Sequence, residues 1–111
     1  MVSNGTSPYL VSLTNDSATI GTDKDGGGYT AAALQAATKT KTEVWLGDTK
    51  LTADDLTYAW TTTGCTLNST TAAEVYCSAL SADTATATVT AKYNNVSIGS
   101  KTFTVSKNKA G

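Results

Sequence analysis

The stretch DTATATVTAKYNN, Asp83 to Asn95, decides the fold of this chain. Polar residues, mostly threonine, alternate in it with small or apolar ones: Ala85, Ala87, Val89, Ala91 and Tyr93. Side chains of a β-strand point to opposite faces in turn, so this period of two predicts a strand with one buried face. We expect the small alanines to leave room for large side chains of an opposite sheet, with Trp60 and Phe103 as candidates.

A turn and a second strand follow this stretch. Asn94-Asn95 is suited to a tight hairpin turn, and VSIGSKTFTVS, residues 96–106, is predicted to be the partner strand. Ile98 and Phe103 have opposite parity along that strand. If both are buried, one extra residue must interrupt the alternation, so a β-bulge is expected at Gly99 or Ser100.

The rest of the chain repeats the alternating pattern in short pieces. Leu56, Tyr58 and Trp60 share one face of a predicted strand, and Val44 and Leu46 share one face of another. Gly47-Asp48 predicts a tight hairpin after the second of these. Further strands are expected within 8–14, 17–22, 38–46, 56–64 and 73–80.

The segment Thr30 to Ala37, TAAALQAA, breaks the alternation. Its alanines, leucine and glutamine favour helix, but eight residues are too few for an independent helix. The sequence predicts a short helical turn near 30–37, or an irregular crossing, with Leu34 pointing inward.

About seven short strands with frequent turn signals predict an all-β fold, an immunoglobulin-like antiparallel β-sandwich. The length of 111 residues is enough for one domain. We assign residues 1–7 to an N-terminal tail, 8–106 to the sandwich and 107–111 to a C-terminal linker, which suggests a piece of a longer protein.

Two segments, LTYAWTTTGC and LSADTATATVTAKYNN with the closing KTFTVSKNKAG, resemble the immunoglobulin-like domains of tailed-bacteriophage tail-tip, host-specificity and tail-fibre proteins. The early SLTNDSATIGTDKDGGGY is similar to their opening strands. The resemblance implies a structural and adhesive module that spaces domains and makes weak host-surface contacts, located on the virion. Bacterial surface adhesins carry similar domains, so the bacterial cell surface is the alternative location. The alanine-rich segment departs from the family pattern.

Composition argues against several classes of function. The net charge is −1, and without a basic stripe nucleic-acid binding has no electrostatic driving force. No apolar run approaches a membrane span. Histidine is absent, which removes the common nucleophilic triads and the commonest zinc ligand. The carboxylate pairs Asp54-Asp55 and Asp23/Asp25 lie in predicted loops, so we expect no enzyme activity and no cofactor.

The glycine-rich DKDGGG, residues 23–28, has two carboxylates at a spacing seen in calcium loops. It lacks the remaining ligands of that motif, including the later bidentate glutamate. We therefore expect no metal site there.

Cys65 and Cys77 are the two cysteines of the chain. They are candidates for a disulfide that closes a short loop. They do not have the antibody-type arrangement, because Trp60 precedes both. Two buried thiols fit the reducing cytoplasm in which a phage protein is assembled, so the sequence leaves both states open.

Trp45 is the candidate surface contact. Val44 and Leu46 occupy the predicted buried face, so an outward Trp45 offers an apolar platform on which a sugar ring could stack. The alternative is that Trp45 packs against the long helical or loop segment. The partners implied are neighbouring domains of the parent protein and, weakly, host surface polysaccharide, without nucleic acid or membrane insertion. A dedicated carbohydrate-binding module is the alternative function.

Overall fold

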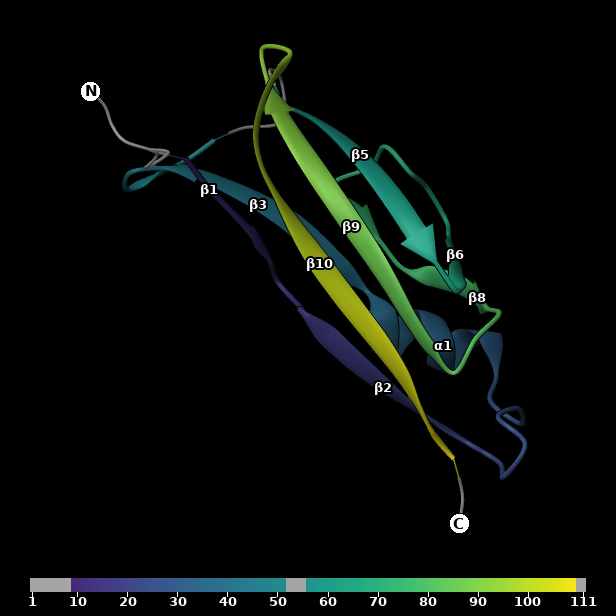
Figure 1. Ribbon diagram of the computed structural model, residues 1–111. Coiled ribbons are helices and arrows are strands. Elements are labelled where there is room, and N and C mark those ends of the chain that lie inside the picture. Colours follow the sequence, from purple (N-terminus) through teal and green to yellow (C-terminus); the bar gives the residue numbers. More distant parts are fainter. Residues whose placement is uncertain (1–8, 52–55, 110–111) are drawn as a thin grey trace.

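The computed structural model describes residues 9–51 and 56–109 of the chain. Ten strands and one helix lie in these ranges (Figure 1): β1 Tyr9–Leu13, β2 Ser17–Thr22, α1 Ala31–Thr38, β3 Thr40–Leu46, β4 Thr49–Lys50, β5 Leu56–Thr63, β6 Cys65–Leu67, β7 Glu74–Val75, β8 Cys77–Leu80, β9 Thr84–Tyr93 and β10 Val96–Lys109. The expected tail, residues 1–7, and the carboxylate pair Asp54-Asp55 lie outside the described residues.

The larger sheet has the strand order β2-β10-β9-β5. The opening stretch forms β9, its central strand, between β10 and β5. Both of these pairings are antiparallel, whereas β2 pairs with β10 in parallel along its whole length. The prediction of a purely antiparallel sandwich is therefore wrong at this one edge.

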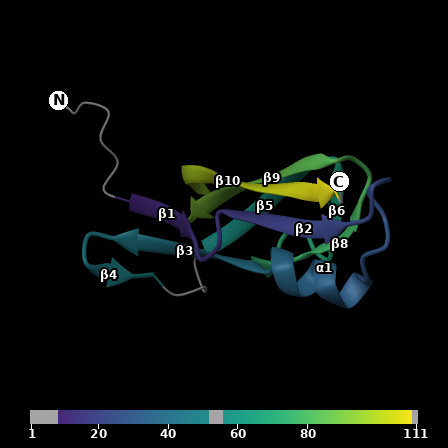
Figure 2. The same ribbon diagram turned by 90° about the horizontal axis from the view of Figure 1, so that it is seen from below.

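A second layer covers the inner face of this sheet (Figure 2). At one end it consists of β1, β3 and β4, with β7 pairing to the beginning of β3. At the other end it consists of α1 and the two-stranded β6–β8 pair. The two main sheets pack as a β-sandwich, which confirms the all-β prediction at that level.

The alanine-rich segment forms the eight-residue helix α1. Thr30 caps its first turn, because the Thr30 hydroxyl accepts a hydrogen bond from the backbone N–H of Ala33 at 3.1 Å. Leu34 is 1% exposed and fills the space between α1 and the larger sheet, as expected. Burial of Leu34 and Thr38 thus stabilises a helix too short to persist alone.

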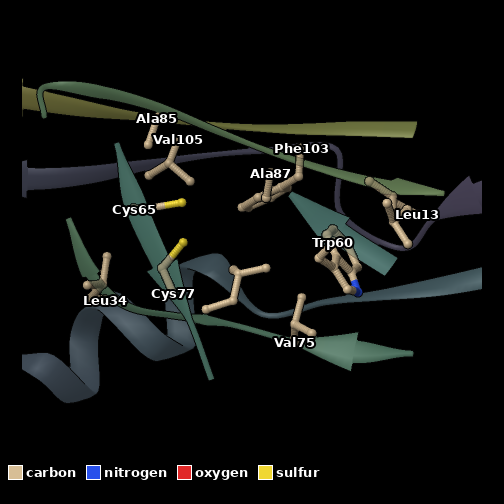
Figure 3. Packing of buried hydrophobic residues seen from close by; sticks show 12 residues of the cluster. Leu13, Leu34, Trp60, Cys65, Val75, Cys77, Ala85, Ala87, Phe103 and Val105 are labelled. Carbon is tan, nitrogen blue, oxygen red and sulfur yellow. The ribbon is translucent and has the colours of Figure 1, made fainter. Parts of the chain in front are cut away.

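The core corrects one expectation about the large aromatic residues (Figure 3). Trp60 and Phe103 are buried, but they lie on β5 and β10, on either side of β9 in the same sheet. Phe103 is in register with Ala87, and Trp60 with Val89. The alanines of β9 therefore leave room for neighbours within their own sheet, because residues in register on adjacent strands share a face.

The opposite layer supplies smaller side chains to this core. They come from β1, α1, β6, β7 and β8: Leu13, Leu34, Cys65, Leu67, Val75 and Cys77. A second, smaller cluster contains Val11, Val44, Leu56 and Ala91, with the half-buried Tyr58 touching both clusters. The interior is thus continuous along the sandwich.

The predicted turns are present. Asn94 and Asn95 have φ values of +52° and +69°, the left-handed conformation that asparagine tolerates better than most residues. The β9–β10 register shifts between Ser97 and Gly99, which makes Ile98 the extra residue of the bulge. The hairpin at Gly47-Asp48 connects β3 to β4 as expected.

Gly99 lies where β1 crosses β10. A Cβ atom placed on Gly99 would lie 2.9 Å from Cγ2 of the buried Val11, closer than carbon atoms tolerate. We expect Gly99→Ala to lower the free energy of unfolding by about 1–3 kcal/mol through this overpacking. Chemical denaturation measures the change, and Gly21→Ala, where a new Cβ meets nothing within 4 Å, is the matched control. Equal stability of both variants would contradict the contact.

Two boundaries differ from those expected. Residues 73–80, predicted as one strand, are divided at Tyr76, because β7 pairs with β3 while β8 pairs with β6. At the end of the chain β10 continues past residue 106 to Lys109, paired with β2. Lys109 also forms an ion pair with Asp83 at 2.7 Å, so these residues of the expected linker pack against the sandwich.

Candidate functional site

Trp45 lies on the outer face of the smaller sheet. In register with it are Leu10 on β1 and Lys50 on β4, and paired residues share a face. Leu10 is 58% exposed, while Trp45 itself is half-buried. The surface around Trp45 is therefore an apolar strip, Leu10 and Trp45, bordered by the Lys50 ammonium group.

Glu43 shares the face of Trp45, two residues earlier on β3. Its carboxylate accepts a hydrogen bond from Lys50 Nζ at 2.8 Å. This hydrogen bond, together with the charges of Lys50 and Lys41, holds the pKa of Glu43 below its usual value. The Glu43 carboxylate and the Lys50 ammonium group are thus paired with each other beside Trp45. Neither of them presents an unpaired charge to the apolar strip.

A gap interrupts strand pairing along one edge of β3. There β4 pairs with Trp45 and Leu46, β7 pairs with Thr40 and Lys41, and neither reaches the middle of the strand. Among the described residues, single backbone hydrogen bonds flank the gap, from Thr42 N to Ala73 O and from Leu51 N to Val44 O, both 2.9 Å.

The gap opens into a cavity of about 280 Å³, here called the gap pocket. Its lining comes from β3, β4 with the following residue, β5 and the residue before β7: Lys41, Thr42, Glu43, Val44, Lys50, Leu51, Tyr58 and Ala73. Glu43 and Lys50, which flank Trp45 on the outer face, are therefore shared between the strip and the gap pocket.

Two residues of the gap pocket are polar and lie inside the sandwich. Thr42 is 2% exposed, and its Oγ1 has no hydrogen-bond partner within the described part of the chain. Tyr58 on the facing sheet is half-buried, and burial raises the pKa of its phenol. Sequence reasoning singled out neither as a site residue. Thr42 could have been noticed, since it alternates in phase with the buried Val44.

A second hollow, of about 420 Å³, runs between α1 and the segment around β7. Its lining is mostly exposed: Ala32, Gln35, Ala36, Lys39, Asn68, Glu74 and Tyr76. Asn68 Oδ1 is occupied by the backbone N–H of Tyr76 at 2.8 Å. No buried polar group without a partner faces this hollow in the ranges described, so it gives no chemical indication of a ligand.

The carboxylate of the predicted calcium-like loop is used by the loop itself. Asp23 Oδ1 accepts hydrogen bonds from the backbone N–H groups of Asp25 and Gly27, each at 2.9 Å. Gly26 and Gly28 adopt positive φ and allow the chain to fold around this carboxylate. Within residues 9–51 and 56–109 no three acidic, histidine or cysteine residues gather as a metal-binding group would require.

Cys65 on β6 and Cys77 on β8 are both buried, and both are free thiols. Their sulfur atoms face one another in Figure 3. The Cys77 N–H donates to the Thr38 hydroxyl at 2.8 Å. Burial, followed by the neighbouring Cys65, raises the pKa of the Cys77 thiol to about 12, and burial also raises the pKa of Cys65. Mass spectrometry of the intact chain distinguishes the two states. A mass two hydrogens below that of the reduced chain would establish the disulfide that the sequence leaves open, in place of the free thiols.

The raised pKa of Cys77 makes stability depend on alkaline pH. Below the pKa of an unfolded cysteine, about 8.5, both states keep their protons. Between that value and about 12 the unfolded chain loses its proton first, so the free energy of unfolding falls as pH rises. We expect the urea midpoint to fall from about pH 8 to about pH 10, and to fall less in Cys77→Ala. Equal decreases in both proteins would contradict the assignment.

No protein-family profile matches the chain, and neither a curated protein nor a solved structure is detectably similar to it. Among the described residues no helix has the length and apolar character needed to cross a membrane.

Proposed function

We propose that the chain is a non-catalytic, immunoglobulin-like module of a phage tail-tip or tail-fibre protein, which spaces neighbouring domains and makes weak contacts with the host surface. The observation that carries the proposal is the path of the chain through an elongated sandwich. Its dimensions are 53 × 27 × 22 Å, and β1 begins near one end of the long axis while β10 ends at the other (Figures 1 and 2). Modules with this geometry join end to end into a rod.

The strand order supports the immunoglobulin-like part of the proposal. In that fold strands A, B and E are neighbours in one sheet, and C, F and G in the other. Here β3 pairs with β1 and β7, and β9 pairs with β5 and β10, in the matching chain order. The resemblance of LTYAWTTTGC and KTFTVSKNKAG to phage domains points to the same class.

Pairing along β10 supports a load-bearing role. Its antiparallel ladder with β9 and its parallel ladder with β2 together hold the last strand from Val96 to Lys109. Tension applied between the two ends of the molecule would act along these ladders, so many backbone hydrogen bonds share the load.

Immunogold electron microscopy tests the proposal. Antibodies raised against the 111-residue chain are expected to label the tail tip or tail fibres of virions produced by the genome that encodes it. Labelling of the bacterial envelope in cells without phage would support the adhesin alternative. Virions and envelopes that are both unlabelled would contradict the two surface locations together.

The carbohydrate-binding module is the second candidate, and the strip around Trp45 favours it. A partly exposed indole bordered by paired polar groups offers a sugar ring an apolar contact. One aromatic contact is worth about 1–3 kcal/mol, by analogy with base stacking, and millimolar binding needs about 4 kcal/mol. Trp45 alone therefore gives undetectable affinity, and adhesion through it would require many copies on one particle.

A further inference from the structure

The two cysteines of the chain form a pair inside the core, and the proposed function does not use them. Cys65 on β6 is 8% exposed, and Cys77 on β8 is 0% exposed. Their sulfur atoms face one another in Figure 3, and the two thiols form a hydrogen bond with each other. A single buried thiol is an ordinary small apolar side chain, but two thiols in contact can also be joined by a bond between their sulfur atoms.

The pair lies at the base of a segment that connects the two main sheets, here called the strap: residues 68–76, between β6 and β8. On the side of the larger sheet, the backbone N–H and the indole Nε1–H of Trp60 donate hydrogen bonds to carbonyl oxygens of the strap, at 2.9 and 2.8 Å. On the side of the smaller sheet, Thr42 N donates to Ala73 O at 2.9 Å, and β7 pairs with β3. Holding the two ends of the strap together therefore also holds the two layers together.

We propose that Cys65 and Cys77 form a redox-sensitive staple at the base of the strap: two thiols in the reducing cytoplasm, and a disulfide once the chain meets a disulfide oxidant such as oxidised glutathione. The Cys65 thiolate attacks one sulfur of the oxidant, and the first glutathione leaves as a thiolate. The Cys77 thiolate then attacks the sulfur of Cys65 and releases the second glutathione. The protein loses one proton and one electron from each thiol, and the oxidant is reduced to two glutathione thiols.

The surroundings of the two thiols give the order of attack. Burial raises the pKa of Cys65, whereas burial and then the neighbouring Cys65 raise the pKa of Cys77 to about 12. Because the thiolate is the attacking form, the more exposed Cys65 reacts first with the oxidant. The Cys77 N–H donates to the Thr38 hydroxyl at 2.8 Å, which ties β8 to α1. In the folded chain this tie must break before an oxidant reaches the pair.

The staple would change the stability of the sandwich with its surroundings. The disulfide closes a loop of about a dozen residues that contains the strap, and a cross-link stabilises a fold by restricting the unfolded chain. The chain is then less stable as a dithiol, where it is synthesised, and more stable as a disulfide outside the cell. This inference goes beyond the proposed function and rests on it only for the passage from a reducing to an oxidising environment.

Refolding of the 111-residue chain with an excess of oxidised or of reduced glutathione tests the staple. We expect the oxidised sample to be monomeric, two hydrogens lighter by intact mass and without a glutathione adduct, with a Tm about 10 °C above that of the reduced sample. Dithiothreitol should restore the reduced mass and the lower Tm. Cys65→Ala and Cys77→Ala are the controls, and neither should gain Tm in oxidised glutathione. Chains that keep both thiols, that link to one another or that gain no stability on oxidation would overturn the proposal.

Oxidation of the chain that is already folded as a dithiol tests the opening of β8. We expect free thiols to disappear about tenfold faster in Thr38→Val than in the wild type, because valine cannot accept the Cys77 N–H. Thr40→Val is the matched control: it removes another buried threonine hydroxyl, which donates to Asn15 O at 2.7 Å instead of binding β8. Equal acceleration in the two variants would show that oxidation requires global unfolding and would overturn the opening of β8.

Failure of the staple and failure of the phage assignment are distinguishable. Immunogold labelling locates the chain on a virion or on a bacterial envelope whatever the state of its thiols. The glutathione experiments use the isolated chain and do not depend on where it is located.

Discussion

Trp60→Ala is expected to lower the free energy of unfolding by about 3–5 kcal/mol, the usual cost of truncating a large buried aromatic residue. Trp60 is 4% exposed and belongs to the main core cluster. The indole Nε1–H also donates a hydrogen bond to Ala72 O at 2.8 Å. The substitution thus removes both a large apolar contact and a tie between β5 and the segment before β7.

Thermal unfolding measures this effect as a decrease of more than about 10 °C in Tm. Trp60→Phe is the control, because it keeps most of the apolar contact and loses the hydrogen bond, so its decrease should be smaller. Trp45→Ala should change Tm much less, since Trp45 is half-buried on the outer face. A Tm of Trp60→Ala within a degree or so of the wild type would contradict the core assignment.

Thr38→Val is the second large effect, and we expect a loss of about 2–3 kcal/mol. Thr38 is 1% exposed at the end of α1, where its hydroxyl donates to Leu34 O at 2.7 Å and accepts from Cys77 N at 2.8 Å. Valine has nearly the same shape but leaves the N–H of Cys77 buried without a partner. The cost is therefore the desolvation of a polar group rather than a cavity.

Urea denaturation of Thr38→Val and Thr42→Val compares two buried threonines of similar exposure, 1% and 2%. Only Thr38 has hydrogen-bond partners in the described chain, so only Thr38→Val should be strongly destabilised. Amide hydrogen exchange at Cys77 should also accelerate in Thr38→Val. Similar stability of the two variants would contradict the role given to the Thr38 hydroxyl as the bridge from α1 to β8.

Local patterns were predictable where a strand has one buried face. Ala85 to Ala91 on β9, and Leu56 and Trp60 on β5, are buried in the phase that the sequence predicts. Leu46 is an exception at the end of β3. It is 38% exposed although it shares the phase of Val44, because β3 ends there and the hairpin extends beyond the core.

The candidate site was predictable only in part. Trp45 stands out as an aromatic residue out of phase with its buried neighbours, and the structure places it on the outer face next to Lys50. The gap pocket has no local signal, since it exists only because β4 and β7 pair with opposite ends of β3. Thr42 differs from Thr40 in its hydrogen bonds alone, which depend on residues distant along the chain.

The sequence by itself determined the β class, the turns at Gly47-Asp48 and Asn94-Asn95 and the bulge near Gly99, because these follow from side-chain periodicity and from local backbone preferences. Tertiary structure alone decided that β2 pairs in parallel with β10, that Trp60 and Phe103 flank β9 within one sheet, and that α1 forms a true helix. The physical reason is that the alternation of apolar and polar residues indicates which face of a strand is buried. It does not indicate which other strand lies beside it. That choice depends on the packing of the whole core.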